Sequence, residues 1–586
     1  MPPIRNTNNK PKNAKASFKK LLMLFSQYKL LTALTLFFLT LQVAIACFTP
    51  ILTKWIMDDI TTYSKIAYYA TVVAILTVFG LIFAMVAEII GMYVNTRIVK
   101  NLRYKLVQKV SKLPLKYYDG NTIGNTLSRI TNDADSLSQN LPNFFMSIFQ
   151  GFCMIVGLVI AMFSVSWQLA LSCFIALPIG FIILFIVMAV SNKYFKQKQA
   201  ALGKINGKIE ETFSGINVVK LYSLEESEVE EFYDYNEKLK TADRASTMFG
   251  SLYMAIFAFT SNLSMGVIAL ACCLLAYYSS SPLTWILLYP VFNIFASQLN
   301  SPLANLSQGF QGMQICIAAG ERIFDFLEEK EMDPDLKDKK IKSLKGNVDF
   351  KHVKFGYSAD KTIINDFSVN IKPGMKVAIV GPTGAGKTTI VNLLMRFYEI
   401  DSGSISIDGI SIKDMNKDYL RSLFGMVLQD AWTFNGTIKE NIIYTSKNKD
   451  ENMIKEICKD TNLNHVVSSL PKGYDTILDE KVTLSAGEKQ LLTIARAMIQ
   501  NAPMMILDEA TSNTDTRTEI IIQNAMDKLT KGRTSFVIAH RLSTIKNADL
   551  ILVMDHGDIV EQGNHKTLLK KKGFYANLYN SQFSEE

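Results

Sequence analysis

Residues 381–389 combine three glycines with a Lys-Thr pair in the spacing of a phosphate-binding loop. The apolar run 377–380 before the loop predicts a buried strand, and residues 390–395 after it predict a helix. In this context backbone N–H groups and a helix N-terminus bind phosphate. We expect Lys387 to contact the β- and γ-phosphates of a nucleotide and Thr388 to ligate Mg²⁺. The candidate nucleotide-binding residues of the loop are Gly381, Pro382, Thr383, Gly384, Ala385, Gly386, Lys387, Thr388 and Thr389.

An acidic pair, Asp508-Glu509, follows the apolar run 504–507, which predicts a second strand. An acid at the end of a buried strand beside a phosphate-binding loop can hold Mg²⁺. We therefore assign Asp508 to the metal and expect Glu509 to orient and polarise the attacking water. A plain acidic pair at a strand end is the alternative.

Ser485 and Gly487 lie in the motif 484–490, which precedes a predicted helix over 491–499. A helix N-terminus in this position could bind an anion. A serine that caps the helix is the simpler explanation for the motif taken alone.

The composition indicates a membrane part joined to a soluble part. The chain has 586 residues, of which 49% are hydrophobic and 20% charged, and it is too long for one compact domain. The net charge of +9 comes from basic segments that flank apolar stretches, so nucleic acid is not the expected partner. The seven cysteines show no C-x-x-C spacing and predict small buried side chains in a reduced chain.

Six apolar spans are long enough to cross a bilayer, near 30–52, 66–94, 141–165, 168–190, 248–278 and 283–307. The two long links between spans are rich in Lys and Arg, and the positive-inside rule places them and both termini in the cytoplasm. Core helices of a soluble protein are the alternative. The predicted domains are a transmembrane domain over 1–327, a linker over 328–345 and an α/β domain over 346–586.

Glu88 is the one acid inside an apolar span, and such residues are expensive to bury in lipid. It could face a cavity and favour cationic cargo, or it could be paired with a neighbouring helix near the inner leaflet. Helix breakers at 117–124 and 213–215 predict turns at the cytoplasmic tips, where a soluble domain could dock, or ordinary loops.

The order of motifs resembles an ATP-binding cassette (ABC) transporter, specifically a bacterial exporter-type half-transporter of the multidrug and lipid kind. The motifs are the phosphate-binding loop, Val427-Leu428-Gln429-Asp430, Leu484-Ser485-Ala486-Gly487-Glu488, Ile506-Leu507-Asp508-Glu509-Ala510-Thr511-Ser512 and Ile538-Ala539-His540-Arg541. The resemblance covers nearly the whole chain. It implies an all-α six-helix transmembrane domain followed by an α/β P-loop NTPase.

The resemblance also implies residue roles. Tyr357 would stack on the adenine, Gln429 would contact Mg²⁺ and the catalytic water, and His540 would contact the γ-phosphate. Ser485 and Gly487 would bind the γ-phosphate held by the other cassette of a dimer, with Asp515 at the seam. The breaks at 117–124 and 213–215 match the family's coupling helices.

The expected activity is ATP hydrolysis, with ATP and Mg²⁺, coupled to export of a drug, lipid or peptide by alternating access. An exporter-folded importer and an ATP-gated channel or regulator are the alternatives. The partner is a second half-transporter in the lipid of a bacterial cell membrane. Glu488-Lys489 and Asn513-Thr514 differ from the common family pattern, so an identical chain and a paralogous half both stay open.

Overall fold

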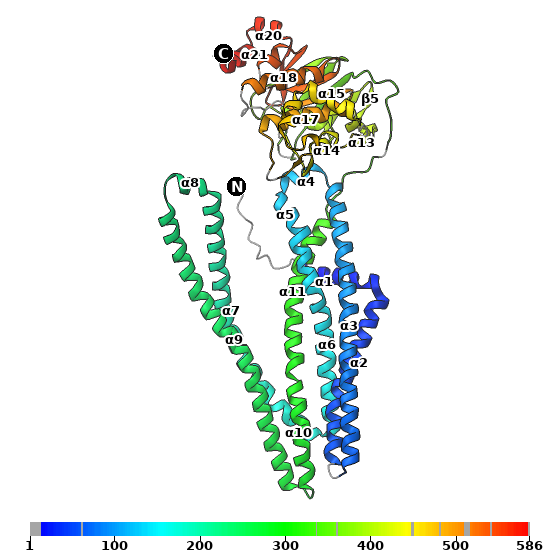
Figure 1. Cartoon of the computed structure of the whole chain (residues 1–586), viewed down its shortest axis with the longest axis vertical. Helices are drawn as coiled ribbons and strands as arrows, with labels where there is room; N and C mark the ends of the chain where they lie inside the picture. The colour runs from blue at the N-terminus through cyan, green and yellow to red at the C-terminus, as the bar shows by residue number, and fades with distance from the viewer. Residues whose placement is uncertain are drawn as a thin grey trace. The chain divides into compact units, whose positions relative to one another are not determined.

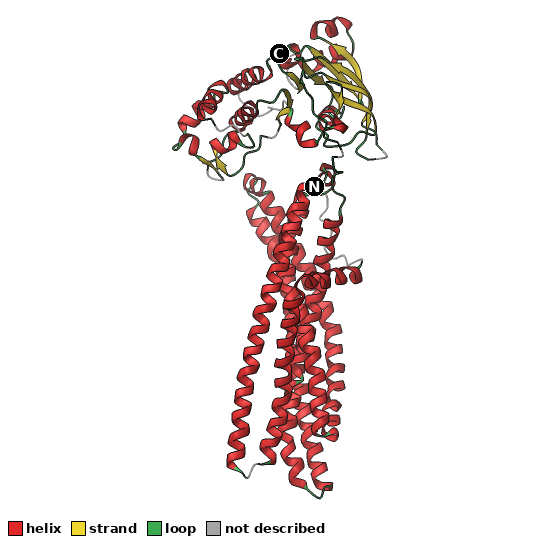
Figure 2. Ribbon diagram, turned by 90° about the vertical axis from the view of Figure 1, so that its right-hand side faces the viewer, coloured by secondary structure: helices red, strands yellow, loops and turns green. Residues whose placement is uncertain are grey.

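The computed structural model describes residues 13–59, 62–335, 337–358, 361–429, 431–446, 450–479, 482–508, 516–539 and 542–583. The chain divides into two compact units (Figure 1). The helical unit consists of Met1–Ser111 and Ile123–Glu329, and the mixed unit consists of Lys112–Thr122 and Lys330–Glu586. In the described parts of the chain, strands occur in the mixed unit and not in the helical unit (Figure 2).

The helical unit is built from very long helices. They are α1 (Ala14–Phe25), α2 (Lys29–Asp58), α3 (Tyr63–Lys112), α5 (Ile123–Ser128), α6 (Ala134–Val165), α7 (Trp167–Ser214), α8 (Ile216–Leu221), α9 (Glu225–Tyr278), α10 (Pro282–Gln298) and α11 (Asn300–Glu328). A π-helical turn, Arg129–Asp133, joins α5 to α6.

Six stretches of the described chain are helical, long and apolar enough to cross a membrane: Ala14–Asp58, Tyr63–Lys112, Ile123–Val165, Trp167–Ser214, Ala258–Tyr278 and Pro282–Glu328. They contain five of the six predicted spans in full and residues 258–278 of the predicted span 248–278, which confirms the predicted helical membrane part. Several continue well past bilayer length, since α3, α7 and α9 have 50, 48 and 54 residues.

The helices pack in pairs. α7 runs along α9, α11 runs along α6, and α10 packs against both α2 and α9. An apolar core with Leu158, Phe292 and Phe295 forms where α2, α6, α7, α9 and α10 meet. Figure 1 shows α7 and α9 diverging from α2, α3, α6 and α11 toward the short helix α8. The α7–α9 hairpin therefore leaves the helices on which its membrane end packs.

The mixed unit contains three sheets. Its strands are β1 (Val348–Phe355), β2 (Ile364–Ile371), β3 (Lys376–Val380), β4 (Ser402–Ile407), β5 (Ile410–Ser411), β6 (Phe424–Val427), β7 (Gly436–Thr437), β8 (Ile477–Leu478), β9 (Met504–Asp508), β10 (Thr534–Ile538), β11 (Leu550–Asp555) and β12 (Asp558–Gly563). The main sheet has the order β12-β11-β3-β10-β9-β6, and all its pairs are parallel except β11–β12. A second sheet, β2-β1-β4-β5, is antiparallel.

Helices cover the main sheet, as the predicted α/β fold requires. They are α12 (Lys387–Leu394), α13 (Lys417–Ser422), α14 (Ile438–Ile443), α15 (Glu451–Asp460), α16 (Leu463–Ser469), α17 (Ala486–Gln500), α18 (Thr516–Thr530), α19 (Leu542–Lys546), α20 (His565–Lys571) and α21 (Phe574–Phe583). The separate segment of this unit, 112–122, contains α4 (Leu115–Gly120). Residues of β9 alternate between two cores: Ile506 packs toward the antiparallel sheet, and Leu507 packs under α14–α18. The apolar strand runs reflect this burial on both faces.

The segment between α11 and β1 is attached to the mixed unit by ion pairs. Asp335 accepts hydrogen bonds from the Arg396 guanidinium at 3.2 Å and from the Lys417 backbone N–H at 2.9 Å. Asp414 accepts from Lys337 and Lys339, which lowers the pKa of its carboxyl to about 2. The described residues of the predicted linker thus lie on the surface of the mixed unit.

Candidate nucleotide site

The phosphate-binding loop leaves the end of β3 and enters α12 at Lys387. Two of its glycines are required by the backbone. A Cβ on Gly381 would lie 2.2 Å from the Met554 carbonyl oxygen, and Gly386, which caps α12, has a φ of 97°. The loop can therefore curl around the helix N-terminus only with glycine at these positions, which leaves its N–H groups available for an anion.

Lys387 is buried, with 8% of its surface exposed. Its ammonium donates to the carbonyl oxygens of Gly381 at 2.8 Å and Pro382 at 3.1 Å. The charge is thus held inside the loop that precedes it. Burial lowers the pKa of Lys387, and the nearby carboxylate of Asp508 opposes that shift.

The register of the main sheet brings the predicted site residues to one edge. Ile538 of β10 lies opposite both Ile379 of β3 and Asp508 of β9. β6 pairs with β9 in parallel, so Gln429, two residues past β6, emerges at the same edge. Because parallel strands end on one side of a sheet, the phosphate-binding loop, Asp508 and Gln429 lie at the same edge. One strand, β10, separates the loop from Asp508, and Gln429 follows the strand next to β9.

Three predicted residues lie outside the described parts of the chain: Glu509, Asp515 and His540. Glu509 is the first residue after β9, which ends at Asp508. His540 is the second residue after β10, which ends at Ile538. Their chain positions thus continue two strands that end beside the loop.

Tyr357 lies just after β1 and contacts α12. Its hydroxyl is 3.2 Å from the Thr389 hydroxyl, and its ring meets Phe355 and Tyr398 edge-on at centroid distances of 5.0 and 4.9 Å. Thr389 is buried, whereas the preceding Thr388 is exposed. The first helical turn thus presents Thr388 outward and uses Thr389 to position Tyr357, a pairing that the sequence spacing does not reveal.

Ser485 caps the N-terminus of α17, which agrees with the simpler of the two interpretations of its motif, a serine that caps the helix. Its hydroxyl accepts from the Glu488 N–H at 3.3 Å, and the Glu488 carboxylate accepts from the Ser485 N–H at 2.8 Å. Ser485 is itself exposed, and Gly487 is buried in the first turn. α17 packs on α14, α15, α18 and β6, so Ser485 belongs to a different part of the unit from β3 and α12.

Arg496 is a positioning residue that the sequence analysis missed. From α17, its guanidinium donates to the carbonyl oxygens of Asn441 at 2.9 Å and Trp432 at 3.2 Å, and it lies over the ring of Tyr444. Asn441 is fully buried and bonds the backbone of Phe434. These contacts attach the segment after Gln429 to α17, the helix that Ser485 caps. An ordinary Arg in a helix gives no sequence signal for such a role.

A phosphate-binding loop on the central strand, with an acid at the end of a strand of the same sheet, defines a P-loop nucleotide hydrolase. In this chain the hydrolase is joined to six helices that can cross a membrane. The fold and site together define the class of ATP-driven membrane transporters.

Comparison with known proteins gives the family. The family model described as "ABC transporter transmembrane region" matches residues 32–303, and the one described as "ABC transporter" matches residues 364–512. The chain therefore belongs to the ABC transporters, with the membrane region and the ATP-hydrolysing cassette of an exporter-type half-transporter in one polypeptide. It is a multi-pass membrane protein that couples ATP hydrolysis to transport.

Bacterial relatives cover most of the chain. It is 40% identical to a fatty acid ABC transporter ATP-binding/permease protein of Mycobacterium bovis, over 84% of this chain and 77% of the relative. It is 36% identical to an ATP-dependent lipid A-core flippase of Saccharophagus degradans, over 84% and 83% of the two chains. It is 33% identical to an uncharacterized ABC transporter ATP-binding protein of Bacillus subtilis, over 96% and 98%.

Proposed function

We propose that the protein is an exporter in a bacterial cell membrane. It moves an amphipathic, lipid-like molecule outward, either from the cytoplasmic leaflet of that membrane or from the cytoplasm. The observation that carries the proposal is the joining of six membrane-crossing stretches to a sheet edge that gathers the phosphate-binding loop and Asp508. Two relatives, a fatty acid transporter and a lipid A-core flippase, support a lipid-like cargo. The basic long links support cytoplasmic termini.

In the proposed site, the residues of this chain bind the phosphates, the base and Mg²⁺. Lys387 and the loop N–H groups bind the phosphates, and Tyr357 stacks on the base. Thr388, Gln429 and Asp508 offer the oxygen ligands that Mg²⁺ prefers, and their positions at the ends of α12, β6 and β9 support that assignment. Mg²⁺ would neutralise charge on the phosphates.

Glu509 orients and polarises the water that attacks the γ-phosphate, and His540 holds the γ-phosphate in place. Gln429 lies at the start of the segment that Arg496 ties to α17, which supports a role in reporting the nucleotide state.

The proposed working form is a dimer of half-transporters, identical or paralogous. Ser485, Gly487 and Asp515 would complete the site of the other copy, because Ser485 is exposed at the start of α17 and not beside its own α12. ATP drives the cycle only if it binds the closed dimer more tightly than the open one. The tips α4 and α8 are the proposed coupling helices, and the grouping of residues 112–122 with the mixed unit supports this for α4.

The experiment is Glu509→Gln in the full chain, reconstituted in vesicles with ATP supplied outside. We expect hydrolysis and uptake of a fluorescent lipid analogue into inside-out vesicles to fall to background while ATP still binds. Hydrolysis at the wild-type rate would refute the assignment of Glu509. Flux in the opposite direction in the wild type would identify an importer.

A further inference from the structure

The six predicted spans contain one formally charged residue, and that residue lines a cavity. Glu88 is the only Asp, Glu, Lys or Arg within the six predicted spans. In the structure it lines a cavity of about 550 Å³ bounded by α2, α3 and α6. A carboxylate at this depth is costly against lipid and is tolerated where it meets water or a partner. The cavity therefore accounts for a residue that a lipid-facing helix would exclude.

Amide and hydroxyl side chains from all three helices share the cavity wall with Glu88. Gln42 comes from α2, Asn95 from α3, and Gln139, Asn143 and Gln150 from α6. The Gln150 amide donates to the Gln42 side-chain oxygen at 3.3 Å across the cavity wall. So many polar side chains at one place in apolar helices indicate a binding or water-filled surface and not a lipid contact.

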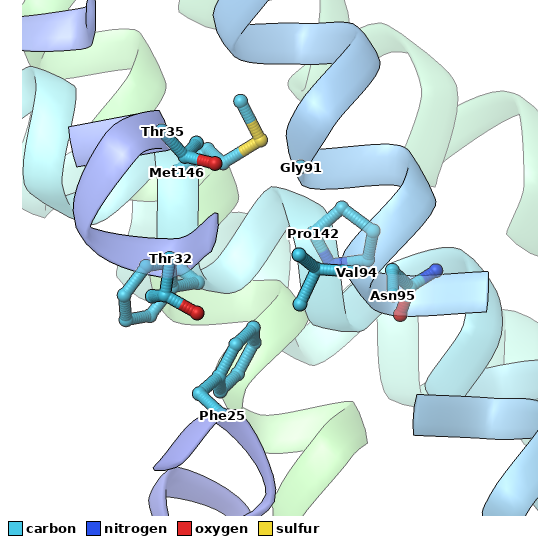
Figure 3. A pocket seen from close by; sticks show the side chains of 9 residues that line it. Phe25, Thr32, Thr35, Gly91, Val94, Asn95, Pro142 and Met146 are labelled. Atoms are coloured by element: carbon cyan, nitrogen blue, oxygen red, sulfur yellow. The ribbon is translucent and has the colours of Figure 1, made fainter. Parts of the chain in front are cut away.

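Asn95 lies behind this wall with an unsatisfied acceptor. It is 6% exposed, and its amide nitrogen donates to the Ser138 carbonyl oxygen at 2.8 Å. Its side-chain oxygen is buried without a hydrogen-bond donor. Figure 3 shows Asn95 beside Val94 and Pro142, in a smaller pocket of about 10 Å³ that adjoins the cavity through shared lining residues. Buried amide oxygens of this kind are rare because they normally find a donor.

No basic side chain of the described chain is paired with Glu88. The next basic residue along α3, Arg97, is nine positions away, roughly 14 Å along the helix axis. Its guanidinium donates to the Tyr93 hydroxyl at 2.9 and 3.1 Å. The negative charge of the cavity is therefore available to a molecule from outside the chain.

We propose that this cavity is the headgroup site for an amphiphile that carries an ammonium group. Glu88 supplies the opposite charge, and the side-chain oxygens of the exposed wall amides Gln139 and Asn143 accept the N–H groups. Leu39, Met92 and Met146 line the same cavity and can contact the start of an alkyl chain. A carboxylate headgroup would meet Glu88 with no Lys or Arg in the predicted spans to neutralise it. This inference rests on the proposed export function and names its substrate class.

The test is equilibrium binding to the full chain in phosphatidylcholine nanodiscs without nucleotide, with empty discs subtracted. The probes are dodecylammonium, dodecanoate and dodecanol, which share one chain length. The wild type should bind dodecylammonium at least about tenfold more tightly than dodecanoate. Glu88→Gln, which removes the charge at nearly constant volume, should weaken dodecylammonium binding about tenfold. Glu88→Asp should keep the preference for the amine.

Thr77→Val is the matched control, because Thr77 lies on α3 away from the cavity and bonds its own helix at Val73. It should leave all three affinities unchanged. Equal binding of amine and carboxylate, unchanged dodecylammonium affinity in Glu88→Gln, or loss of the preference in Glu88→Asp would each overturn the inference. Binding is measured without ATP, so it is independent of export. If the protein is not an exporter, none of the three probes will show ATP-driven flux, although the preference for binding the amine can remain.

Discussion

At Lys387, two physical demands oppose each other. The ammonium must be charged to hold phosphates, yet it is 8% exposed, and burial lowers its pKa. Its bonds to the Gly381 and Pro382 carbonyls and the charge of Asp508 favour the protonated form. The site thus keeps a desolvated cation charged by surrounding it with oxygen atoms before a nucleotide arrives.

Asp508→Asn should therefore change the pH dependence of nucleotide binding. Removing the Asp508 charge lowers the pKa of Lys387 further, and binding is lost as the pH rises through that pKa. The alkaline limb of binding, followed with a fluorescent ATP analogue without Mg²⁺, should move to lower pH. Asp527→Asn, which removes an ion pair with Lys376, is the control. An alkaline limb that stays in place or moves upward would show that Asp508 does not support the charge.

Ser485 offers a second residue-level prediction, since capping and catalysis can be separated. Ser485→Ala removes the capping hydroxyl and should destabilise the cassette by about 1 kcal/mol. Ser485→Asp keeps a capping oxygen, so its thermal unfolding should match the wild type. It should nevertheless lose ATP hydrolysis, because a carboxylate would then face the γ-phosphate of the partner copy. Wild-type hydrolysis in Ser485→Asp would leave Ser485 with a capping role alone.

At the level of elements, an ion cluster around the buried Lys208 joins the ends of α7 and α9 that lie next to α8. Lys208 of α7 contacts Glu231 at 2.6 Å and Glu228 at 3.0 Å, and the Thr212 hydroxyl donates to Glu228 at 2.6 Å. The Thr212 hydroxyl and then Lys208 lower the pKa of Glu228. These contacts hold together the hairpin that leaves the other helices, so α8 at its tip can move as one piece with α7 and α9.

Lys208→Met should loosen this tip. Lys208 is 9% exposed but its partners are more accessible, so we expect a loss of about 1 kcal/mol in local stability. Amide hydrogen exchange in Ile216–Leu221 should then accelerate roughly fivefold. Lys204→Met, which changes an exposed lysine on the same helix, is the matched control. Equal exchange in the two variants would assign no role to the cluster.

The sequence predicts elements better than their contacts. The six spans and the strand–loop–helix at 377–395 were predictable because hydropathy and glycine spacing are local signals. The convergence of Asp508 with the loop followed from the parallel sheet. The pairing of Tyr357 with Thr389, and of Arg496 with Asn441, joins residues more than thirty positions apart and leaves no periodic pattern. The direction that Glu88 faces likewise depends on how α2, α3 and α6 pack.

For the whole molecule, one cassette and six membrane-crossing stretches make half of the proposed pump. The exposed Ser485 and the loop at Thr383 belong to different parts of one cassette, and the proposal joins them only across two copies. The account therefore requires that nucleotide, and not simple contact, brings the copies together.

Disulfide cross-linking between Thr383→Cys and Ser485→Cys tests this claim most directly. The background is the full chain in nanodiscs with Glu509→Gln and with the native cysteines replaced, which are mostly buried. With ATP, oxidation should convert the 65.7 kDa band to one of twice that mass, and without nucleotide it should not. The account would be contradicted by a band that stays at monomer mass with ATP, both for this chain alone and with any co-purifying paralogous half that carries the same two substitutions. A dimer that forms equally without ATP would also contradict it.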